Sequence, residues 1–467
     1  MSLLKSICFF VALGIYRLGW CLAIPGVILR LLLKGSKSEQ EYNSWPYIVE
    51  RFGFYPIFKK KQNNDSKPGL LICKYSKTIW IHAVSVGETR AVVPLLELIL
   101  DNNQDCQIVL THMTIGGRKV GEALAKQYQP RLITCYVPYD MSFAVHRFLN
   151  FFKPSVCLLM ETEIWPMLTL VLKKIKIPLV LINARLSEKS LKKAQRYGYL
   201  SKTIFGNLDM VMAQNQSDAK RFEMIGAKQI IVNGNLKFDN FPAPEMFELG
   251  KQWRDGFQGR PTWVAISTRA GEENILLNVH KKLLEQFPQA LLIIVPRHAT
   301  RCDEVLRLAQ THFEVARRSA IHFHPKENST WHLPSNINIW LGDSMGEVVA
   351  YCAASDIAFV GGSLVPTGGQ NLIECCSAKI PVVFGPSMYN FSQASADALA
   401  KGAACQIKNS DELLGCLTEL FLNSYKQSQM AAAAYEFRMA HTGASRLTYQ
   451  ALQQQLQQQL SLSALNK

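Results

Sequence analysis

The amino-acid sequence predicts an α/β protein made of two doubly wound, Rossmann-like domains. From about residue 78 onward, short apolar runs alternate with helical segments, which is typical of βαβ units on a parallel sheet. The alternation stops in the proline-containing stretch KFDNFPAPEMFELG and then resumes. A chain of 467 residues is also too long for one ordinary domain and long enough for two.

Residues 1–40 are predicted to form a membrane anchor. The segment is strongly apolar, but Arg17 and Pro25 leave no uninterrupted span of the usual ~20 residues. It would either cross the bilayer with Arg17 snorkelling or lie in the interface. A cleaved signal peptide is disfavoured because no small-residue cleavage site follows, and a buried helix because the segment is apolar all round. Lys34 and Lys37, which follow the apolar run within this segment, predict that the rest of the chain lies on the cytoplasmic side.

The first Rossmann-like domain is predicted to span residues 41–240. Its strands are short apolar runs, and its helices carry apolar residues at helical spacing. The predicted strands are TIWIHAV, CQIVLTHM, SVCLLME, IPLVLINA, DMVMAQ and QIIVNGN. The predicted helices are RAVVPLLELIL, AVHRFLNFF, WPMLTLVLKKI and QSDAKRFEMIG.

The second domain is predicted to span residues 241–430, after the break in the pattern. Two such domains predict a cleft between them, with binding sites at the carboxyl ends of the strands. Residues 431–467, which end in a Gln-rich stretch, are predicted to form a peripheral helix and a frayed tail. The predicted strands of this domain are TWVAIST, ALLIIVP, NINIWLG, DIAFVGG and IPVVFGP.

The net charge indicates which class of partner the protein binds, and the cysteines indicate the redox state of its compartment. The chain has 51 Lys and Arg against 36 Asp and Glu, a net charge of +15, which favours anionic partners. The basic residues are scattered and form no nucleic-acid-binding signature, so no nucleic-acid partner is expected. The 12 cysteines fall at irregular positions, many within apolar runs, as expected for small buried residues in a reducing compartment.

The segment AFVGGSLVPTGGQNLIECCSAKIPVVFGP has the pattern of a nucleotide site. A strand runs into one glycine pair, a loop, a second pair, and a helix predicted to begin at Asn371. Glycines let the backbone approach a phosphate, and helix N–H groups attract an anion. Glu374, one turn into the helix, could accept hydrogen bonds from two ribose hydroxyls. One glycine pair would fit a plain crossover equally well; two pairs and the glutamate favour nucleotide binding.

From ERFGFY near residue 50 to GPSMYNF near residue 391, the chain resembles the Kdo (3-deoxy-D-manno-octulosonic acid) transferases of the lipopolysaccharide pathway. These motifs are specific only together and in order. Those between the two ends are HAVSVGET, VPYD, METEIWP, INARLS, AQN, GNLKFD, IST, GEE, VPRH, GDSMGE and FVGGSLV.

The resemblance implies an inverting glycosyltransferase of GT-B fold. Such enzymes move Kdo from CMP-Kdo to a hydroxyl of the lipid A precursor, lipid IVA, at the inner membrane, release CMP, and use no metal or other cofactor. The sequence contains no Asp-x-Asp pair of the kind that holds a metal–nucleotide complex, which agrees with this expectation. On this resemblance, the domain of residues 41–240 is expected to bind the acceptor, and the basic surface to dock on anionic lipid at the cytoplasmic face of that membrane.

The general base is expected to be Glu88. Transfer to a neutral hydroxyl requires a base, and by resemblance this is the glutamate of SVGE, at a strand-to-helix turn. The helix N-terminus is expected to keep its carboxylate ionised. By pattern alone, Glu88 is equally an ordinary first-turn glutamate that complements the helix dipole.

Two further residues are expected to stabilise the transition state. By resemblance they are Lys237 in GNLKFD and Glu161 in METEIWP. Any single lysine is more commonly a solvated surface residue, and only the resemblance separates Glu161 from Glu163. A buried Glu161 needs a partner, for which Arg185 in INARLS is the candidate.

By resemblance, the CMP contacts come from VPRH, DSMGE and NLIE. Arg297 is suited to gripping phosphate oxygens, and Met345 and Gly346 are expected to open a helix whose N–H groups read the cytosine edge. Ser267 and Thr268, also before a helix, would add to the phosphate site. The implied contact residues are Pro296, Arg297, Met345, Gly346, Glu347, Asn371, Leu372, Ile373 and Glu374.

The chain departs from the family pattern near the donor. It has Arg269 and Gln370 where histidine is usual, and Leu372 where proline is usual. Arg269 keeps a hydrogen-bond donor and adds a fixed charge, whereas Gln370 keeps a donor and loses the titratable ring. These differences affect donor geometry rather than the class of reaction.

Other interpretations fit parts of the sequence. Another GT-B envelope glycosyltransferase, using a UDP-sugar and a lipid acceptor, would share the fold and the glycine-rich loop. A catalytically inactive membrane scaffold would keep the nucleotide fold, but the intact Glu88, Lys237 and Glu374 argue against it. The histidines of IHFHPKENSTWH are interpreted as a surface loop, not as a metal site.

Overall fold

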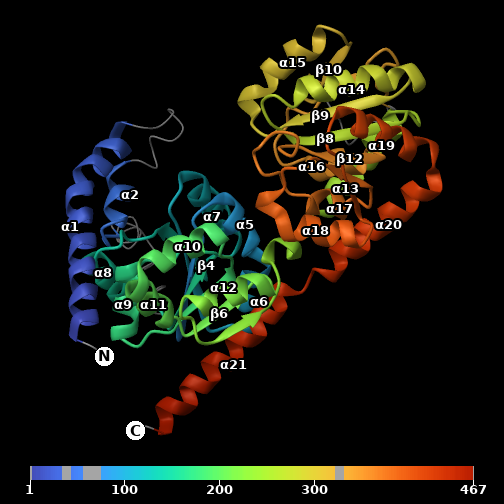
Figure 1. Ribbon diagram of the computed structural model, residues 1–467. Helices are drawn as coiled ribbons and strands as arrows, with labels where there is room; N and C mark the ends of the chain where they lie inside the picture. The colour runs from blue at the N-terminus through green and yellow to red at the C-terminus, as the bar shows by residue number, and fades with distance from the viewer. Residues whose placement is uncertain (1–2, 34–43, 56–74, 321–330, 466–467) are drawn as a thin grey trace. The chain divides into compact units, whose positions relative to one another are not determined.

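The computed structural model describes residues 3–33, 44–55, 75–320 and 331–465. They form two compact units (Figure 1). Unit 1 comprises Met1–Asn240 and Thr442–Lys467, and unit 2 comprises Phe241–His441. Each unit has its own seven-stranded sheet in which every pairing is parallel, which confirms the prediction of two doubly wound α/β domains.

The sheet of unit 1 has the strand order β3-β2-β1-β4-β5-β6-β7. The chain builds outward from β1 to β3 and then returns to place β4 beside β1, so the winding direction reverses between these two strands. Ligands bind at such a switch point, outside the carboxyl ends of the strands. The strands are β1 (Lys77–His82), β2 (Cys106–His112), β3 (Leu132–Tyr136), β4 (Val156–Met160), β5 (Leu179–Ala184), β6 (Met210–Ala213) and β7 (Ile230–Val232).

Helices cover both faces of this sheet. Side chains alternate between the faces, so a strand buried on both sides is apolar at every position. On β1, Trp80 belongs to one core cluster and Ile79 and Ile81 to the other. The helices are α1 (Leu3–Leu33), α2 (Trp45–Glu50), α5 (Val86–Ala91), α6 (Val93–Asn102), α7 (Ile115–Gln127), α8 (Ser142–Phe152), α9 (Pro166–Lys174), α10 (Glu188–Arg196), α11 (Gly198–Gly206), α12 (Gln216–Met224), the 3₁₀ helix η2 (Leu236–Asp239) and α21 (Ala444–Leu465).

Helix α1 packs on unit 1 with one face and exposes apolar side chains elsewhere. Its Leu13 is buried in the core, and the hydroxyl of Tyr16 donates a 2.7 Å hydrogen bond to Oδ2 of Asp140. The same carboxylate accepts from the backbone N–H groups of Met167 and Leu168 in the first turn of α9. By length and composition, Phe9–Val27 could cross a membrane. The exposed apolar residues of α1 include Phe10, Val11, Ile15, Leu18, Leu22 and Leu29.

Helix α21 brings the C-terminal segment back to unit 1, next to α6 (Figure 1). Ala444, Tyr449 and Leu452 lie in the core of unit 1. The prediction of a peripheral helix from residue 431 is therefore wrong in two respects. The last helix is part of a core, and the residues before Thr442 belong to unit 2.

The sheet of unit 2 has the order β10-β11-β9-β8-β12-β13-β14, so its switch point lies between β8 and β12. The sequence analysis missed β3, β10 and β14, which are all edge strands. The apolar pattern is weak in β10 and β14, whereas β3 is apolar and mostly buried. The strands are β8 (Thr262–Thr268), β9 (Leu291–Pro296), β10 (Val315–Arg317), β11 (Ile339–Leu341), β12 (Ile357–Val360), β13 (Val382–Phe384) and β14 (Ala404–Gln406).

The helices of unit 2 include one that the sequence hid. Part of the expected linker forms α13, whose first residue is Pro244, because a proline fits the first turn of a helix. Every described cysteine is a free thiol, as expected. The helices are α13 (Pro244–Gly256), α14 (Glu273–Gln286), α15 (Cys302–Gln310), α16 (Val348–Ala353), α17 (Ile373–Ser377), α18 (Ser392–Ala400), α19 (Ser410–Leu422), α20 (Ser424–Ala440) and the 3₁₀ helices η3 (Ala299–Arg301), η4 (Arg318–Ala320) and η5 (Tyr389–Phe391).

Candidate functional site

Glu88 lies in the turn between β1 and α5, at the switch point of unit 1. Its Oε2 accepts a 2.8 Å hydrogen bond from the N–H of Val84, and its Oε1 accepts a 3.0 Å bond from the hydroxyl of Ser85. Ser85 is the N-cap of α5, and its hydroxyl also accepts from the backbone N–H of Glu88, so the two residues cap the helix together. The capping role that the sequence left open is therefore present, and it fixes the carboxylate at the carboxyl end of β1.

The environment of Glu88 favours its protonated form more than the sequence analysis predicted. Burial raises the pKa of Glu88 to about 7, and the nearby charges of Glu161 and Glu163 act in the same direction. The hydrogen bonds from Val84 and Ser85 oppose these effects without cancelling them. The helix N-terminus therefore does not keep Glu88 fully ionised at neutral pH, because burial raises its pKa to about 7.

The raised pKa predicts a pH dependence. A general base must be deprotonated, so kcat/KM is expected to rise with pH through a midpoint of about 7. Replacing Glu163 by Gln removes one of the negative charges that raise the pKa, and is expected to move this acid limb to lower pH with little loss in the plateau. The measurement is a pH–rate profile of both proteins. An acid limb that stays in place in Glu163→Gln would contradict the assignment.

Glu161 and Lys237 form an ion pair in unit 1. Nζ of Lys237 lies 2.8 Å from Oε1 of Glu161, and each side chain is about a quarter to a third exposed, at 31% and 23%. The structure thus gives Glu161 the partner that a partly buried carboxylate needs, and this partner is Lys237. Glu163 does not continue the strand, because β4 ends at Met160; its carboxylate accepts from the indole N–H of Trp165 instead.

Strained backbone marks the carboxyl ends of the central strands. Glu161, Asn183 and Ser267, at the ends of β4, β5 and β8, have φ values of 55°, 50° and 54°. Non-glycine residues adopt such values at a cost of about 1–3 kcal/mol, and these residues cluster at functional sites. Asn183 is 2% exposed, and its Oδ1 accepts from the N–H of Leu236, next to Lys237. In unit 1, the strained residues are therefore Glu161 itself and Asn183, which contacts the neighbour of Lys237.

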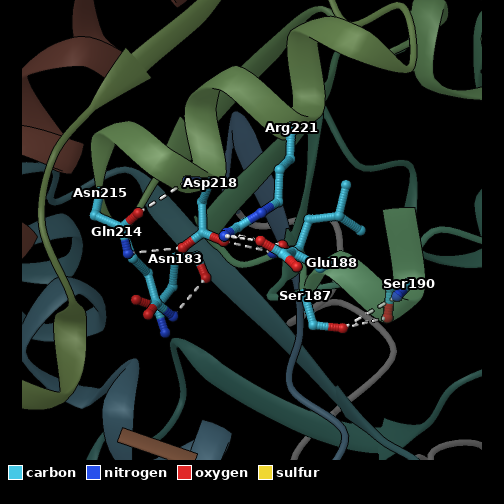
Figure 2. Close-up of polar contacts among 9 residues, drawn as sticks. Asn183, Ser187, Glu188, Ser190, Gln214, Asn215, Asp218 and Arg221 are labelled. Carbon is cyan, nitrogen blue, oxygen red and sulfur yellow. Dashed lines mark hydrogen bonds and ion pairs between the residues drawn. The ribbon is translucent and has the colours of Figure 1, made fainter. Parts of the chain in front are cut away.

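The motifs INARLS and AQN are joined by hydrogen bonds at the carboxyl ends of β5 and β6 (Figure 2). Asp218, on α12, accepts from the amide of Asn215 at 2.8 Å and from Nη1 of Arg221 at 3.2 Å. The amide of Gln214 donates to the backbone oxygen of Asn183 at 3.0 Å. INARLS and AQN thus join the loops after β5 and β6, and their polar residues act here as structural ties.

In unit 2, a carboxylate closes the turn that follows β12. Oε1 of Glu272 accepts from the N–H groups of Ser363 and Leu364, both at 2.9 Å. Its Oε2 accepts from Gly362 at 2.6 Å and from Arg269 at 2.9 Å. Burial raises the pKa of Glu272, and the four hydrogen bonds act against that rise. The sequence analysis quoted GEE but gave Glu272 no role, because no local pattern indicates a contact 90 residues away.

The residues of VPRH lie at the same switch point. Pro296 is the buried last residue of β9, and Arg297 follows it, exposed. Nε of Arg297 donates to the side-chain oxygen of Gln370 at 3.1 Å. The hydroxyl of Thr268, expected to serve a phosphate, instead donates to Glu273 at 2.9 Å. The structure thus places Arg297 beside the glycine-rich loop. The hydroxyl of Thr268 is occupied by its hydrogen bond to Glu273 within unit 2.

The DSMGE residues differ from expectation in one respect. Helix α16 begins at Val348, so Met345 and Gly346 form a bend before the helix and do not open it. Gly346 has φ 87°, which explains the glycine, and Met345 is 70% exposed. Glu347 accepts from the guanidinium of Arg318 at 3.1 Å. The bend leaves Met345 free to contact a ligand.

The NLIE residues divide into a buried pair and a half-buried pair. Leu372 and Ile373 are buried, so their side chains belong to the core and only their backbone could meet a nucleotide. Oδ1 of Asn371 accepts from Ile373 at 3.1 Å, and its amide donates to Glu374 at 3.2 Å. Helix α17 starts at Ile373, two residues later than predicted. Asn371 and Glu374 therefore remain the polar side chains that a ribose could reach.

Of the three histidines in IHFHPKENSTWH, the structure describes one. His332 is exposed, and His322 and His324 lie outside the described residues. Within the described ranges, no cluster of three or more His, Cys, Asp or Glu side chains has the arrangement of a metal site.

Comparisons with known proteins show the family. Residues 47–240 match the family described as 3-Deoxy-D-manno-octulosonic-acid transferase (kdotransferase). The chain is 37% identical to the 3-deoxy-D-manno-octulosonic acid transferase of Bordetella pertussis, over 80% of this chain and 86% of the relative. It is 34% identical to that of Haemophilus influenzae, over 85% and 88%.

A solved structure shows the fold independently. HepE of Anabaena, in complex with UDP, is similar with a TM-score of 0.54 at 15% identity, over 82% of this chain and 99% of the other. Together with the two parallel sheets, this similarity confirms the predicted GT-B class of fold. The identity to two transferases over most of their length establishes more than the fold. The chain belongs to the family of Kdo transferases, the glycosyltransferases of lipopolysaccharide biosynthesis.

Proposed function

We propose that this chain transfers Kdo from CMP-Kdo to the lipid A precursor, lipid IVA, with inversion at the anomeric carbon and without a metal. The observation that carries this proposal is the cluster at the switch point of unit 1, where a half-buried Glu88 lies near the Glu161–Lys237 ion pair. A base with a pKa of about 7 can take a proton from a sugar hydroxyl at neutral pH.

In the proposed reaction, Glu88, Lys237 and Glu161 each have one role. Glu88 removes the proton of the acceptor hydroxyl as its oxygen attacks the anomeric carbon. The bond to the phosphate of CMP breaks at the same time, so negative charge develops on the leaving group. Lys237 is the cation that stabilises this charge, and Glu161 holds the ammonium group at 2.8 Å. No step of this scheme uses a metal.

Unit 2 is proposed to hold the nucleotide. Arg297 offers a guanidinium beside the glycine-rich loop, and Asn371 and Glu374 offer polar atoms at the start of α17. Pro296, Leu372 and Ile373 are buried, so they would contribute backbone atoms and shape. The bend before α16, which contains Met345, Gly346 and Glu347, is proposed to face the cytosine ring of CMP.

The donor class is tested by thermal unfolding. A ligand that binds only the folded protein stabilises it by RT ln(1 + [L]/Kd), about 2.7 kcal/mol at 100 times Kd. CMP is expected to raise the unfolding temperature of the full chain, and UDP at the same concentration is expected to leave it nearly unchanged. Protection by UDP and not by CMP would replace this proposal with that of a UDP-sugar transferase.

We further propose that α1 lies in the interface of the inner membrane, on its cytoplasmic face. One face of the helix is occupied by contacts with unit 1, through Leu13 and Tyr16, and the remaining surface is largely apolar. An apolar strip on a helix that lies along a domain is suited to shallow insertion. The net charge of +15 would add attraction to anionic lipid.

This anchoring predicts the outcome of a flotation assay. The full chain is expected to float with vesicles that contain anionic lipid. The double variant Leu18→Glu/Leu22→Glu, on the exposed side of α1, is expected to lower the bound fraction at least tenfold, because each buried leucine contributes roughly 1.5–3 kcal/mol. Leu422→Glu, at a similarly exposed leucine on α19, is the matched control. Equal flotation of the double variant and the control would contradict this placement.

A further inference from the structure

The glycine turn after β12 has no backbone donors left to offer an anion. Its N–H groups at Gly362, Ser363 and Leu364 already donate to Glu272. The hydroxyl of Thr367 donates to the oxygen of Gly362 at 2.9 Å, which closes the turn on its other side. The part of the backbone anion site that the first glycine pair suggested is therefore filled by the chain itself. At this turn, side chains are the groups that can still hold a negatively charged donor.

Two guanidinium side chains lie beside that turn. A Cβ atom on Gly362 would lie 3.4 Å from Cγ of Arg269 and 3.3 Å from Nε2 of Gln370. Gln370 in turn accepts from Nε of Arg297 at 3.1 Å. The backbone N–H of Arg269 is held by Glu272, the same carboxylate that closes the turn. Arg269 thus lies beside Gly362, and Arg297 contacts Gln370, which lies beside the same glycine.

The charges of these two arginines are not compensated within the described part of the chain. Neither Arg269 nor Arg297 forms an ion pair there, whereas Arg301, Arg317 and Arg318 each pair with carboxylates. Cations without acidic partners at the carboxyl ends of central strands are suited to an anionic ligand.

The contacts of Arg269 leave part of its guanidinium unused. Nη1 of Arg269 lies 3.0 Å from Nε2 of His298. Because a guanidinium only donates hydrogen bonds, this nitrogen of His298 carries a lone pair, and the ring is neutral. Among the described residues, Nε of Arg269 is buried and has no hydrogen-bond partner. A carboxylate can accept from two guanidinium N–H groups at once, which would satisfy such a donor.

We propose that Arg269 binds the carboxylate of the acidic sugar in the donor, while Arg297 binds the phosphate that joins the sugar to the nucleotide. This assignment rests on the proposed function, in which the donor is CMP-Kdo, a molecule with these two anionic groups. Arg269 then distinguishes the complete donor from CMP alone, because only the donor carries the carboxylate. Glu272 is a positioning residue that holds Arg269 and the glycine turn together.

The test compares the binding of CMP and of freshly prepared CMP-Kdo by calorimetry, without acceptor, in the full chain. Arg269→Gln is expected to weaken CMP-Kdo binding roughly 10- to 100-fold, the worth of hydrogen bonds to a charged group, and CMP binding by less than about twofold. Arg297→Gln is expected to weaken both ligands by similar factors. Arg307→Gln, at an exposed arginine on α15, is the matched control.

Each outcome decides the proposal. It is overturned if Arg269→Gln leaves CMP-Kdo binding unchanged, or weakens CMP and CMP-Kdo equally. It is also overturned if the unaltered chain binds CMP-Kdo no more tightly than CMP. Arg269→Lys keeps the charge but loses the fork, and is expected to bind CMP-Kdo with intermediate affinity. If binding follows these expectations but the unaltered chain transfers no Kdo, the proposed function fails while the assignment of Arg269 stands.

Discussion

Replacing Glu88 by Gln is expected to lower kcat for Kdo transfer by roughly 10²- to 10⁴-fold, the usual contribution of a general base. The amide cannot take the proton of the acceptor hydroxyl. Its oxygen can still accept from the N–H of Val84, so the turn before α5 is expected to keep its shape. The measurement is steady-state transfer of Kdo to the lipid A precursor, together with calorimetric binding of CMP, which is expected to be unchanged.

The control for this variant is Glu223→Gln, at an exposed glutamate on α12. It makes the same chemical change on the same unit, and is expected to retain full activity. If Glu88→Gln also retained full activity, then Glu88 would be a capping residue only, as its bond with Ser85 allows. The proposed mechanism would then lose its base.

Replacing Lys237 by Met is expected to lower kcat by roughly 10²- to 10³-fold, comparable to the removal of one preorganised donor from an enzyme that stabilises developing charge. The change also leaves Glu161 without the cation that lies 2.8 Å away. The variant therefore has two effects: it removes the cation that stabilises the leaving group, and it leaves the charge of Glu161 unpaired. The measurements are kcat for transfer and the thermal unfolding temperature of the same sample.

A double variant separates these two effects. Lys237→Met/Glu161→Gln removes the unpaired charge as well, and is expected to recover stability without recovering kcat, because breaking an ion pair costs more than replacing both partners. Lys220→Met, at an exposed lysine on α12, is the matched control. Recovery of activity in the double variant would show that Lys237 only neutralises Glu161.

Most of the fold could be predicted because the central strands are buried on both faces. In β1, β4 and β5, the side chains on both faces of the strand are buried in a hydrophobic core. The sequence of each strand is therefore a continuous apolar run. The edge strands β10 and β14 lack that signal, because each has only three residues and is partly buried. Helix α13 was hidden because Pro244 was interpreted as a linker residue, although it forms the first turn of the helix.

The site could be predicted only in part, because its contacts join distant segments. The capping pattern around Glu88 is local and readable, yet it fits a structural role equally well, and only the resemblance favoured catalysis. Glu161 and Lys237 are 76 residues apart, and Glu272 and Gly362 are 90 apart. No local pattern encodes such pairs. Burial also cannot be read from a turn sequence, so the raised pKa of Glu88 was not foreseen.

The measurement that tests the account most directly is the mass of the lipid product. The full chain is supplied with CMP-Kdo, generated in situ, and with the tetra-acylated lipid A precursor. The account predicts that the precursor gains the mass of at least one Kdo residue and that CMP is released in equal amount. A precursor whose mass is unchanged, under conditions where the chain is folded and binds CMP, would contradict it.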